Sequence, residues 1–308
     1  MDFNQLTYFR AVAKYENITK AAKELHITQP NLSTSIAKLE DELGVRLFDR
    51  IKGRVILNVK GRRFLEYVER AFNELSNGVM VASEDESEPH AVVRISSAVG
   101  RIMNDIALEC FAHWPKLKMS TLYEDNNTCV QKLLSGETDI ALLTISPEKI
   151  DRFEAVNVLN EDINFLVMKD HPLAGRGTVS LAELAQENLI CDNTMYDNNL
   201  IYDMFRINGY EPSICYLTNE HREILDVMKL TGAVSVCPGH IIPSGSTRMR
   251  AENDNVRILK LAPQSLTRSI WLTRCRDRLL SYYSERVYEC MVEFFDRLRE
   301  SIDNCSVL

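Results

Sequence analysis

The chain has 308 residues, 45% of them hydrophobic and 26% charged, with a formal net charge of -8 at pH 7. This length exceeds what one hydrophobic core usually organises, so we expect about two or three domains. No run approaches the roughly eighteen apolar residues of a membrane span, and the first residues lack the basic and apolar parts of a signal peptide. We therefore expect a cytoplasmic protein.

The charge is distributed unevenly along the chain. Residues 1–65 contain 12 Lys+Arg and 7 Asp+Glu, a balance of +5, which leaves 24 and 37, or -13, for the remainder. A basic N-terminal region before an acidic body is typical of a protein whose first domain contacts nucleic-acid phosphates.

Eight cysteines are scattered along the chain, with no C-x-x-C pair and no His nearby in metal-ligand spacing. We interpret them as reduced, mostly buried thiols and expect no metal site. A redox switch stays open, because spacing alone does not pair distant cysteines.

Three groups of apolar residues recur at helical spacing before residue 44, which predicts three short helices on one small core. Asn17 and Thr28 are the expected N-caps of the second and third helices, and Pro30 fits the first turn of the third. Between the second helix and Thr28, the expected N-cap of the third, lie only His26 and Ile27. This connection is as short as a helix-turn-helix requires. The groups are Leu6, Phe9, Val12 and Ala13; Ile18, Ala21, Ala22 and Leu25; and Leu32, Ile36, Leu39 and Leu43.

A β-hairpin is predicted directly after the third helix, which we expect to end at Gly44. Residues 45–50 and 54–57 are strand-like and flank a Lys-Gly turn. The tip of this wing holds Arg50, Lys52 and Arg54, which suit contact with a DNA backbone or minor groove.

The exposed face of the third helix carries short polar side chains without carboxylates, as needed to read base edges in a major groove about 12 Å wide. A protein-interaction module fits the same periodicity, but this polar face favours DNA. Glu40, Asp41 and Glu42 cluster at the far end of the helix, and we expect them outside the groove. The polar residues are Gln29, Asn31, Ser33, Thr34 and Ser35.

The segments 6–9, 21–33 and 39–50 together resemble the LysR-type transcriptional regulators, a compound pattern far more specific than a short motif. The resemblance implies that Gln29, Pro30, Ser33 and Thr34 face the operator, and that Arg50 and Arg54 contact its backbone. The chain has Thr34 where the family very often has Arg, and Asn58 where it usually has Thr. The full expected DNA-binding set is Gln29, Pro30, Asn31, Ser33, Thr34, Arg50, Lys52 and Arg54.

A heptad-like seam follows Gly61, because apolar residues advance by alternating steps of three and four. Such a seam favours a partner helix, and dimeric DNA readers place two recognition helices roughly 34 Å apart. One amphipathic helix packed on its own domain is the alternative. The resemblance implies a dimerising linker helix and a tetramer as the family's usual state, followed by an acidic hinge at 83–89. The seam consists of Leu65, Val68, Phe72, Leu75, Val79 and Ala82.

Beyond Pro89 short apolar strands alternate with amphipathic helices, which predicts a parallel, doubly wound α/β fold. The expected strands are 92–95, 118–123, 139–144, 164–168, 188–191 and 233–236, and the expected helices include 102–114, 128–134, 180–185 and 200–208.

Ligands of open α/β sheets bind at the carboxyl ends of the strands, which gives candidate pocket residues. Each of them is equally compatible with an ordinary turn or cap. The expected effector-binding set is Ser97, Ala98, Val99, Asn126, Thr144, Asn193, Thr194 and Thr218; their neighbours Asp125, Ile145, Asp192 and Asn219 share these turns.

The segments 132–141, 171–174, 180–185 and 209–212 resemble the LysR effector-binding domain. The resemblance implies a periplasmic-binding-protein-like (type 2) fold, with two lobes, the ligand between them, and crossings near 160–162 and 267–269. The expected domains are 1–59, a winged helix-turn-helix; 60–89, the linker helix and hinge; and 90–308, the effector domain. Its lobe I comprises 90–161 and 268–308, and its lobe II comprises 162–267.

We therefore expect a transcription regulator that binds double-stranded promoter DNA, a small-molecule effector and a second copy of itself. A small carboxylate suits the helix N-terminus after Ser97, with Arg101 nearby, and no cofactor is expected. An enzyme is disfavoured, because the chain lacks a phosphate-binding glycine loop, a G-x-S-x-G elbow and an H-E-x-x-H motif. A periplasmic carrier is disfavoured by the basic N-terminal region. A thiol-based peroxide sensor, using Cys191 and Cys215, is the remaining alternative.

Overall fold

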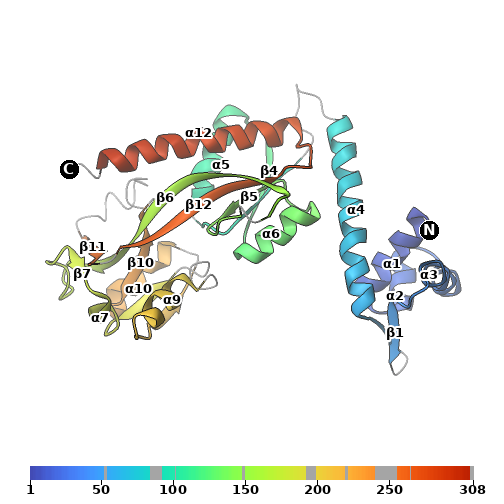
Figure 1. Cartoon of the computed structure of the whole chain (residues 1–308), viewed down its shortest axis with the longest axis horizontal. Coiled ribbons are helices and arrows are strands. Elements are labelled where there is room, and N and C mark those ends of the chain that lie inside the picture. The colour runs from blue at the N-terminus through green and yellow to red at the C-terminus, as the bar shows by residue number, and fades with distance from the viewer. Residues whose placement is uncertain are drawn as a thin grey trace. The chain divides into compact units, whose positions relative to one another are not determined.

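The computed structural model describes residues 1–51, 54–83, 92–100, 102–147, 150–191, 199–218, 221–239, 255–263 and 265–305. The chain divides into two compact units, Met1–Val79 and Met80–Leu308 (Figure 1). Within the described residues, no helix combines the length and apolar character needed to span a membrane.

The N-terminal unit contains the three predicted helices and the predicted hairpin. Asn17 accepts a hydrogen bond from the backbone N–H of Lys20 at 3.0 Å, and Gly44 ends the third helix at a φ of 67°. Thr28 occupies the N-cap position of that helix, but its side chain makes no capping hydrogen bond. The elements are α1 (Phe3–Tyr15), α2 (Ile18–Glu24), α3 (Gln29–Leu43), β1 (Phe48–Ile51), β2 (Arg54–Leu57) and α4 (Val59–Ser83).

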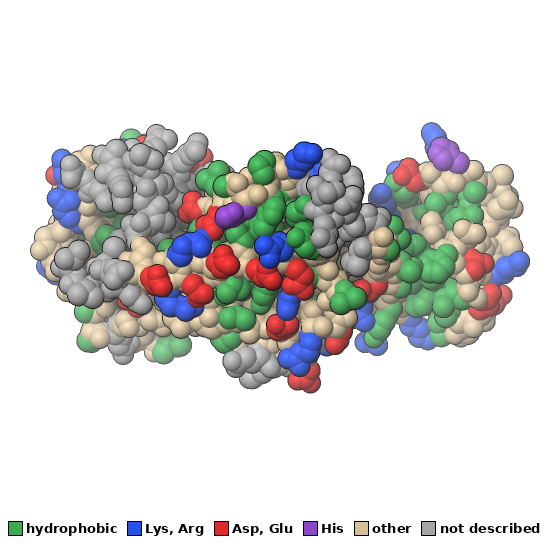
Figure 2. Space-filling view, turned by 90° about the horizontal axis from the view of Figure 1, so that it is seen from above, with side chains coloured by type: hydrophobic (Ala, Val, Ile, Leu, Met, Phe, Trp, Pro, Cys, Tyr) green, Lys and Arg blue, Asp and Glu red, His purple; other side chains and the backbone are tan. Residues whose placement is uncertain are grey.

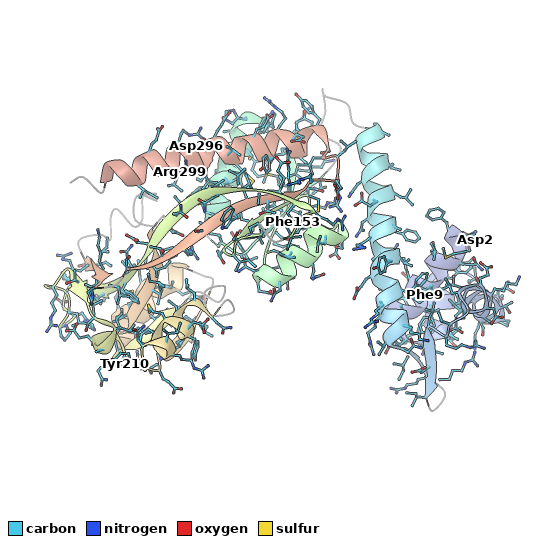
Figure 3. The ribbon with its side chains drawn as sticks, in the orientation of Figure 1. Asp2, Phe9, Phe153, Tyr210, Asp296 and Arg299 are labelled. Atoms are coloured by element: carbon cyan, nitrogen blue, oxygen red, sulfur yellow. The ribbon has the colours of Figure 1, made fainter. Side chains whose placement is uncertain are left out.

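A cluster of aromatic side chains connects α1, β1 and α4. Phe9 of α1 is fully buried, and its ring centroid lies 5.5 Å from that of Phe48 on β1 and 5.2 Å from that of Phe64 on α4 (Figure 3). The start of α4 therefore belongs to the same core as the helices and the hairpin.

The apolar seam of α4 divides into two parts. Val68 is 3% exposed within the N-terminal core, and Leu65 and Phe72 pack against that core. Leu75 and Val79, further along the same seam, are 49% and 68% exposed. The first part of α4 thus packs on its own domain, which was the alternative to a partner helix. The second part presents its apolar side chains to solvent.

The second unit is built on one mixed sheet with the strand order β4-β3-β5-β12-β6-β10-β8-β9, with β11 beside β6 and β7. Its strands are β3 (Val92–Ser97), β4 (Lys118–Tyr123), β5 (Ile140–Leu143), β6 (Phe153–Met168), β7 (Thr178–Val179), β8 (Asn188–Cys191), β9 (Ser213–Leu217), β10 (Val234–Pro238), β11 (Val256–Leu261) and β12 (Leu266–Cys275). Its helices are α5 (Ile102–His113), α6 (Asn126–Ser135), α7 (Leu181–Leu184), α9 (Leu200–Ile207), α10 (His221–Thr231) and α12 (Tyr282–Cys305).

The expectation of a parallel, doubly wound sheet needs correction. β3, β4 and β5 are parallel, as are β8, β9 and β10, but the long strands β6 and β12 pair antiparallel to each other between these two groups. The strands β6 and β12 are antiparallel because one leaves a lobe and the other returns to it, so the two must run in opposite directions. In their register Asp162 lies opposite Thr267 and Asn160 lies opposite Ser269, at the positions predicted for the crossings.

The second unit has several hydrophobic clusters. One joins α5 and α12 to β3, β5, β6 and β12, another joins β6, β8 and β10 to α9, and two smaller clusters include buried residues of α6 and of α10. The outer surface of α12 carries acidic and basic side chains intermixed, as Figure 2 shows. Arg286 pairs there with Glu289, and Arg299 with Asp296.

Candidate functional site

The start of α3 displays the polar residues that the sequence predicts for DNA contact. Gln29, Pro30, Asn31 and Thr34 are exposed, and Ser33 is half-buried. Leu32, Ile36 and Leu39, on the opposite face, are buried in the core. The apolar face of α3 is thus buried, and its polar face is open to a large partner. This polar face carries no carboxylate over the first two turns of the helix.

A neighbouring helix orients one of these side chains. The hydroxyl Oγ1 of Thr19 on α2 donates a hydrogen bond to Oε1 of Gln29 at 3.2 Å. This leaves the amide nitrogen of Gln29 to donate elsewhere. A Gln side chain that recognises adenine presents both its oxygen and its nitrogen to the edge of the base. A hydrogen bond that fixes the orientation of the amide therefore affects which base Gln29 can recognise.

Glu40 lies near the far end of α3, and its side chain is 6% exposed beneath the wing. Its Oε1 accepts hydrogen bonds from the backbone N–H groups of Leu47 at 2.7 Å and Phe48 at 3.1 Å. Its Oε2 accepts one from Arg46 at 2.7 Å, which raises the pKa of Arg46. Asp41 and Glu42 are exposed. Glu40 therefore connects the recognition helix to the first strand of the wing.

The two arginines of the wing lie on opposite faces of the ribbon. Arg50 pairs with Val55 and Ile51 pairs with Arg54, and successive side chains of a strand alternate between faces. Arg50 also lines a hollow of about 460 Å³ between α3 and the wing, together with Ser33, Ala37 and Arg46. Arg50 thus faces the recognition helix, whereas Arg54 points away from it. Lys52, the third predicted wing residue, lies outside the described residues.

The base of the wing is closed by Asn58 and Gly61. Asn58 donates from Nδ2 to the carbonyl oxygen of Arg46 at 3.0 Å and accepts from the backbone N–H of Gly61 at 2.9 Å. Asn58 therefore joins the start of α4 to the segment before the wing. A Cβ atom on Gly61 would lie 2.1 Å from the carbonyl oxygen of Leu47, so the start of α4 approaches the wing too closely for a side chain.

The predicted effector residues of the first lobe gather at the carboxyl ends of β3, β4 and β5. Asn126 is buried, its Nδ2 donates to Oγ1 of Thr144 at 2.9 Å, and the backbone N–H of Thr144 donates to Oδ1 of Asn126 at 2.8 Å. The sequence placed these two residues on separate turns, and the fold brings them together as a reciprocal pair.

The turn at Ser97 is occupied by its own hydrogen bonds. The N–H of Ala98 donates to the carbonyl of Leu142 at 2.8 Å, and the N–H of Val99 donates to Oγ of Ser97 at 3.1 Å. Ser97, Ala98 and Val99 are fully buried. The N–H groups of Ala98 and Val99 are already used, so any anion at this turn would rely on groups further along the chain.

The N-terminus of α6 is capped by Asp125, which the sequence places next to the predicted pocket residue Asn126. The Thr128 hydroxyl and its backbone N–H donate to Asp125, and the hydroxyl contributes most to holding the pKa of this carboxyl below its usual value. A capping carboxylate fixes the turn on which Asn126 lies.

In the second lobe, Thr218 follows β9 and is buried, and its N–H donates to the carbonyl of Cys191 at 3.2 Å. It lies at the carboxyl ends of β8 and β9, as expected for a pocket residue. Asn193 and Thr194, the other predicted residues of this lobe, and Arg101 of the first, fall outside the described residues. The effector-binding assignment therefore stays a prediction.

A buried ion pair, which is not among the sites predicted from the sequence, joins the two crossing strands. Arg268 on β12 and Glu161 on β6 lie opposite each other, with Nε and Oε1 2.7 Å apart, and their side chains are 5% and 1% exposed. A Cβ on Gly239 would lie 3.0 Å from the carbonyl of Asp162, so the end of β10 also approaches this crossing closely. The sequence did contain an indication of this pair, because residues of opposite charge lie in the two segments predicted as crossings.

Two family models match the chain. Residues 3–62 match a model described as a bacterial regulatory helix-turn-helix protein of the lysR family, and residues 88–296 match the LysR substrate binding domain. The second match alone covers more than half of the chain.

Two relatives show the extent of the similarity. The uncharacterized HTH-type transcriptional regulator YybE of Bacillus subtilis (strain 168) is 30% identical over 243 residues, covering 77% of this chain and 82% of the relative. The DNA-binding transcriptional dual regulator OxyR of Escherichia coli (strain K12) is 30% identical over 193 residues, covering 62% of this chain and 63% of OxyR. The alignment with OxyR thus spans less than two thirds of that protein.

Solved structures share the fold along nearly the whole chain. CbnR, a LysR family transcriptional regulator, has a TM-score of 0.62 at 21% identity and covers 97% of this chain and 99% of its own. Full-length CbnR complexed with its target DNA has a TM-score of 0.64 at 21% identity, covering 97% and 100%. The predicted fold class, a winged helix-turn-helix followed by a two-lobed α/β domain, is confirmed. The chain belongs to the LysR family of DNA-binding transcription regulators, with an N-terminal helix-turn-helix and a C-terminal substrate-binding domain.

Proposed function

We propose that the protein binds double-stranded promoter DNA as a dimer, with α3 in the major groove, and responds to a small molecule held by its C-terminal domain. The observation that carries the DNA contact is the exposed, carboxylate-free start of α3, beside the arginine-bearing wing. Promoter DNA as the partner puts the proposed site of action in the cytoplasm. The relatives are named as transcriptional regulators, and no catalytic step is proposed.

Gln29 and Arg54 have different proposed roles and supply the test. Gln29 reads a base edge, so Gln29→Ala loses about 1–3 kcal/mol of discrimination at one base pair. Arg54 neutralises a phosphate, so Arg54→Ala weakens binding to all sequences and flattens the plot of log K against log salt by about 0.9.

The measurement is fluorescence anisotropy across a salt series, with a duplex selected from random sequences by the unaltered protein and a set of single-base-pair variants. Lys229→Ala, on the exposed surface of the second unit, is the control and should leave both quantities unchanged. Identical losses from Gln29→Ala and Arg54→Ala would contradict the assigned roles.

The dimer contact is proposed for the second half of α4. Leu75 and Val79 continue the seam whose first half packs on its own domain, and both are exposed. Burying an exposed Leu or Val side chain against a partner contributes roughly 1.5–3 kcal/mol. Leu75→Lys with Val79→Lys should therefore shift the equilibrium toward monomer in analytical ultracentrifugation. An unchanged distribution would refute this contact. A tetramer is the state that we propose for the full assembly.

The effector is proposed to bind at the strand ends that carry Asn126 and Thr144 in one lobe and Thr218 in the other, as a small carboxylate. Buried polar side chains that recognise a ligand fix its orientation, which supports a hydrogen-bonding ligand of this kind. Thermal-shift screening of small carboxylates and amino acids is the test, because a ligand that binds the folded state raises the melting temperature. Thr144→Val should abolish the shift of any true effector; a shift that persists would place the effector elsewhere.

Ligand binding is proposed to bring the lobes together about the β6–β12 crossing, and so to change the spacing of the recognition helices and the bend in the DNA. Footprint length and gel-measured bending with and without the ligand test this coupling. Both quantities unaltered at saturating ligand would refute it.

A further inference from the structure

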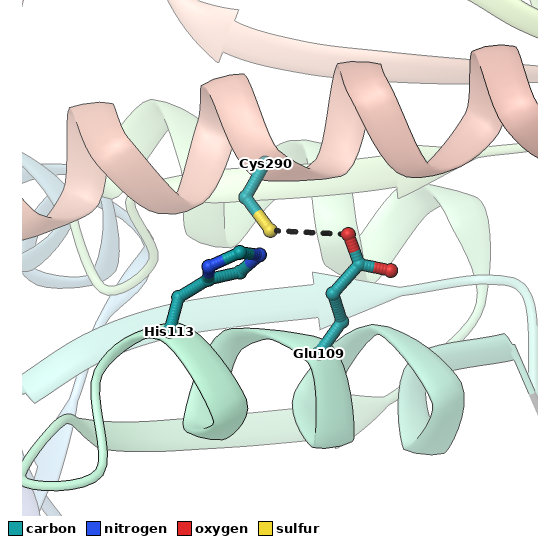
Figure 4. A group of neighbouring side chains, drawn as sticks. All are labelled: Glu109, His113 and Cys290. Atoms are coloured by element: carbon teal, nitrogen blue, oxygen red, sulfur yellow. Dashed lines mark hydrogen bonds between the residues drawn. The ribbon is translucent and has the colours of Figure 1, made fainter.

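Three side chains of different chemistry meet between α5 and α12 in the C-terminal unit. Glu109 and His113 lie one turn apart on the same face of α5, and Cys290 approaches them from α12 (Figure 4). A carboxylate oxygen, an imidazole nitrogen and the thiol sulfur all lie within 4.8 Å of one another. Residues from distant parts of the chain therefore converge on a single point.

The spacing of these atoms is close to that of ligands on one metal ion. Sγ of Cys290 lies 3.9 Å from Oε1 of Glu109. A tetrahedral zinc ion, with Zn–S of about 2.3 Å and Zn–O of about 2.0–2.2 Å, requires a sulfur–oxygen separation of about 3.6 Å. His113 is exposed, so its ring turns toward the other two without disturbing the core. Small side-chain movements thus suffice to form the ligand set.

A divalent cation bound here would offset the repulsion between the Cys290 thiolate and the Glu109 carboxylate, whose Oε1 lies 3.9 Å from the sulfur. Arg297 donates a hydrogen bond to Oε1 of Glu109. Such a donor orients a ligating carboxylate.

We propose that Glu109, His113 and Cys290 bind a divalent zinc ion, with water at the fourth position, and that this ion joins α5 to α12. The donor set selects the metal: a thiolate with an imidazole suits zinc, whereas calcium and magnesium prefer oxygen ligands alone. From the sequence we expected no metal site, because its cysteines form neither a C-x-x-C pair nor a recognised metal-ligand motif with a His. The tertiary fold supplies the third ligand.

The test uses the full chain, freed of metal and kept reduced with a phosphine, because Sγ of Cys110 lies 3.8 Å from Sγ of Cys290 and the two must stay thiols. Zinc is titrated in competition with a chromophoric chelator, and cobalt is titrated separately for its thiolate charge-transfer band. We expect one zinc ion per chain at this site, with release of protons on binding, because the ligands must be deprotonated to hold the metal.

Each substituted ligand should weaken zinc binding at least about 100-fold, more than the loss of an outer-shell partner does. Cys290→Ser should also remove the cobalt charge-transfer band. His113→Ala changes an exposed side chain and therefore tests the site without disturbing the core. The matched controls are His26→Ala and Cys215→Ser, both exposed and on other elements, which should bind as the unaltered protein does. Equal zinc affinity in the unaltered protein, Cys290→Ser and His113→Ala, or no thiolate band in the unaltered protein, would overturn the proposal.

Discussion

Glu40 on α3 accepts a 2.7 Å hydrogen bond from the backbone N–H of Leu47, at the point where the chain enters the wing. The same oxygen accepts from Phe48, so two backbone donors that would otherwise be buried without a partner are satisfied by one carboxylate. The recognition helix and the wing are thereby held as one rigid surface, and their joint fit to DNA depends on a residue that does not itself face the groove.

Removing this connection should destabilise the N-terminal unit. Glu40→Ala leaves the N–H groups of Leu47 and Phe48 unpaired, at about 1–3 kcal/mol each. Asp41→Ala, its exposed neighbour, should change stability by no more than about 0.5 kcal/mol. Urea denaturation followed by circular dichroism measures both, and a Glu40→Ala protein as stable as Asp41→Ala would contradict the proposed role.

The hydrogen bond from Thr19 to Gln29 should affect sequence choice more than affinity. Thr19→Val keeps the shape of the side chain but leaves the Gln29 amide free to rotate, because the hydroxyl donor is gone. We expect discrimination at the base pair read by Gln29 to fall, with the salt dependence unchanged. Anisotropy with single-base-pair variants measures this; an unaltered preference would mean that DNA itself orients Gln29.

Two glycines of α4 should respond in opposite directions to the same substitution. At Gly61 an added Cβ meets the carbonyl oxygen of Leu47 at 2.1 Å, so Gly61→Ala should be destabilising by several times the roughly 1 kcal/mol typical of point mutations. At Gly78 nothing lies within 4 Å of an added Cβ, so Gly78→Ala should stabilise the helix by about 0.5–1 kcal/mol. Thermal denaturation of both variants checks the contrast. Similar melting temperatures would be incompatible with the close approach at Gly61.

The buried pair of Glu161 and Arg268 predicts a non-additive result. Arg268→Met leaves a buried carboxylate without its partner and should cost about 3–5 kcal/mol, whereas the double variant Glu161→Gln, Arg268→Met should cost less than Arg268→Met alone. The comparison is a double-mutant cycle by urea denaturation of the C-terminal unit within the full chain. Additive losses would show that the two side chains do not interact across the crossing.

Asp125 predicts a loss of stability in acid. Its pKa is lowered in the folded state, chiefly by the Thr128 hydroxyl, so its stabilising contribution is present above the unfolded value near pH 4 and is lost as the pH falls through the folded value. Asp125→Asn keeps a side chain that caps helices but does not titrate in this range. The difference in melting temperature between the two proteins should therefore diminish below about pH 4. A constant difference down to about pH 3 would contradict this assignment.

Much of the local structure was accessible from the sequence. The periodicity of Leu32, Ile36 and Leu39 predicted both the third helix and its buried face, and Gly44 marked its end correctly. Strands β4 and β8 lie at the predicted residues. Strand β8 is a short apolar run that is buried after its first residue, whereas β4 is a largely exposed strand at the edge of the sheet. The resemblance to the LysR family, carried by compound motifs, predicted the architecture that the comparisons confirm.

Other features depended on contacts between distant residues. Strand β6 extends back to Phe153, well before the predicted start at 164, because its first half is stabilised by pairing with β12 more than by its own apolar pattern. Helix α12 was not anticipated, although Tyr283, Val287, Met291 and Phe295 recur at helical spacing and are buried. Glu40 carried a signal as well, since it lies four residues after Ile36 on the same helical face.

The sequence by itself determined the three-helix head, the wing, the alternation of strands and helices and the family, because these follow from local periodicity, turn chemistry and contiguous motifs. The tertiary structure alone decided that the sheet has an antiparallel centre, that Asn126 pairs with Thr144, and that Cys290 meets Glu109 and His113. The physical reason is that such contacts arise when a whole fold buries its hydrophobic cores, and no local pattern records which distant residues then become neighbours.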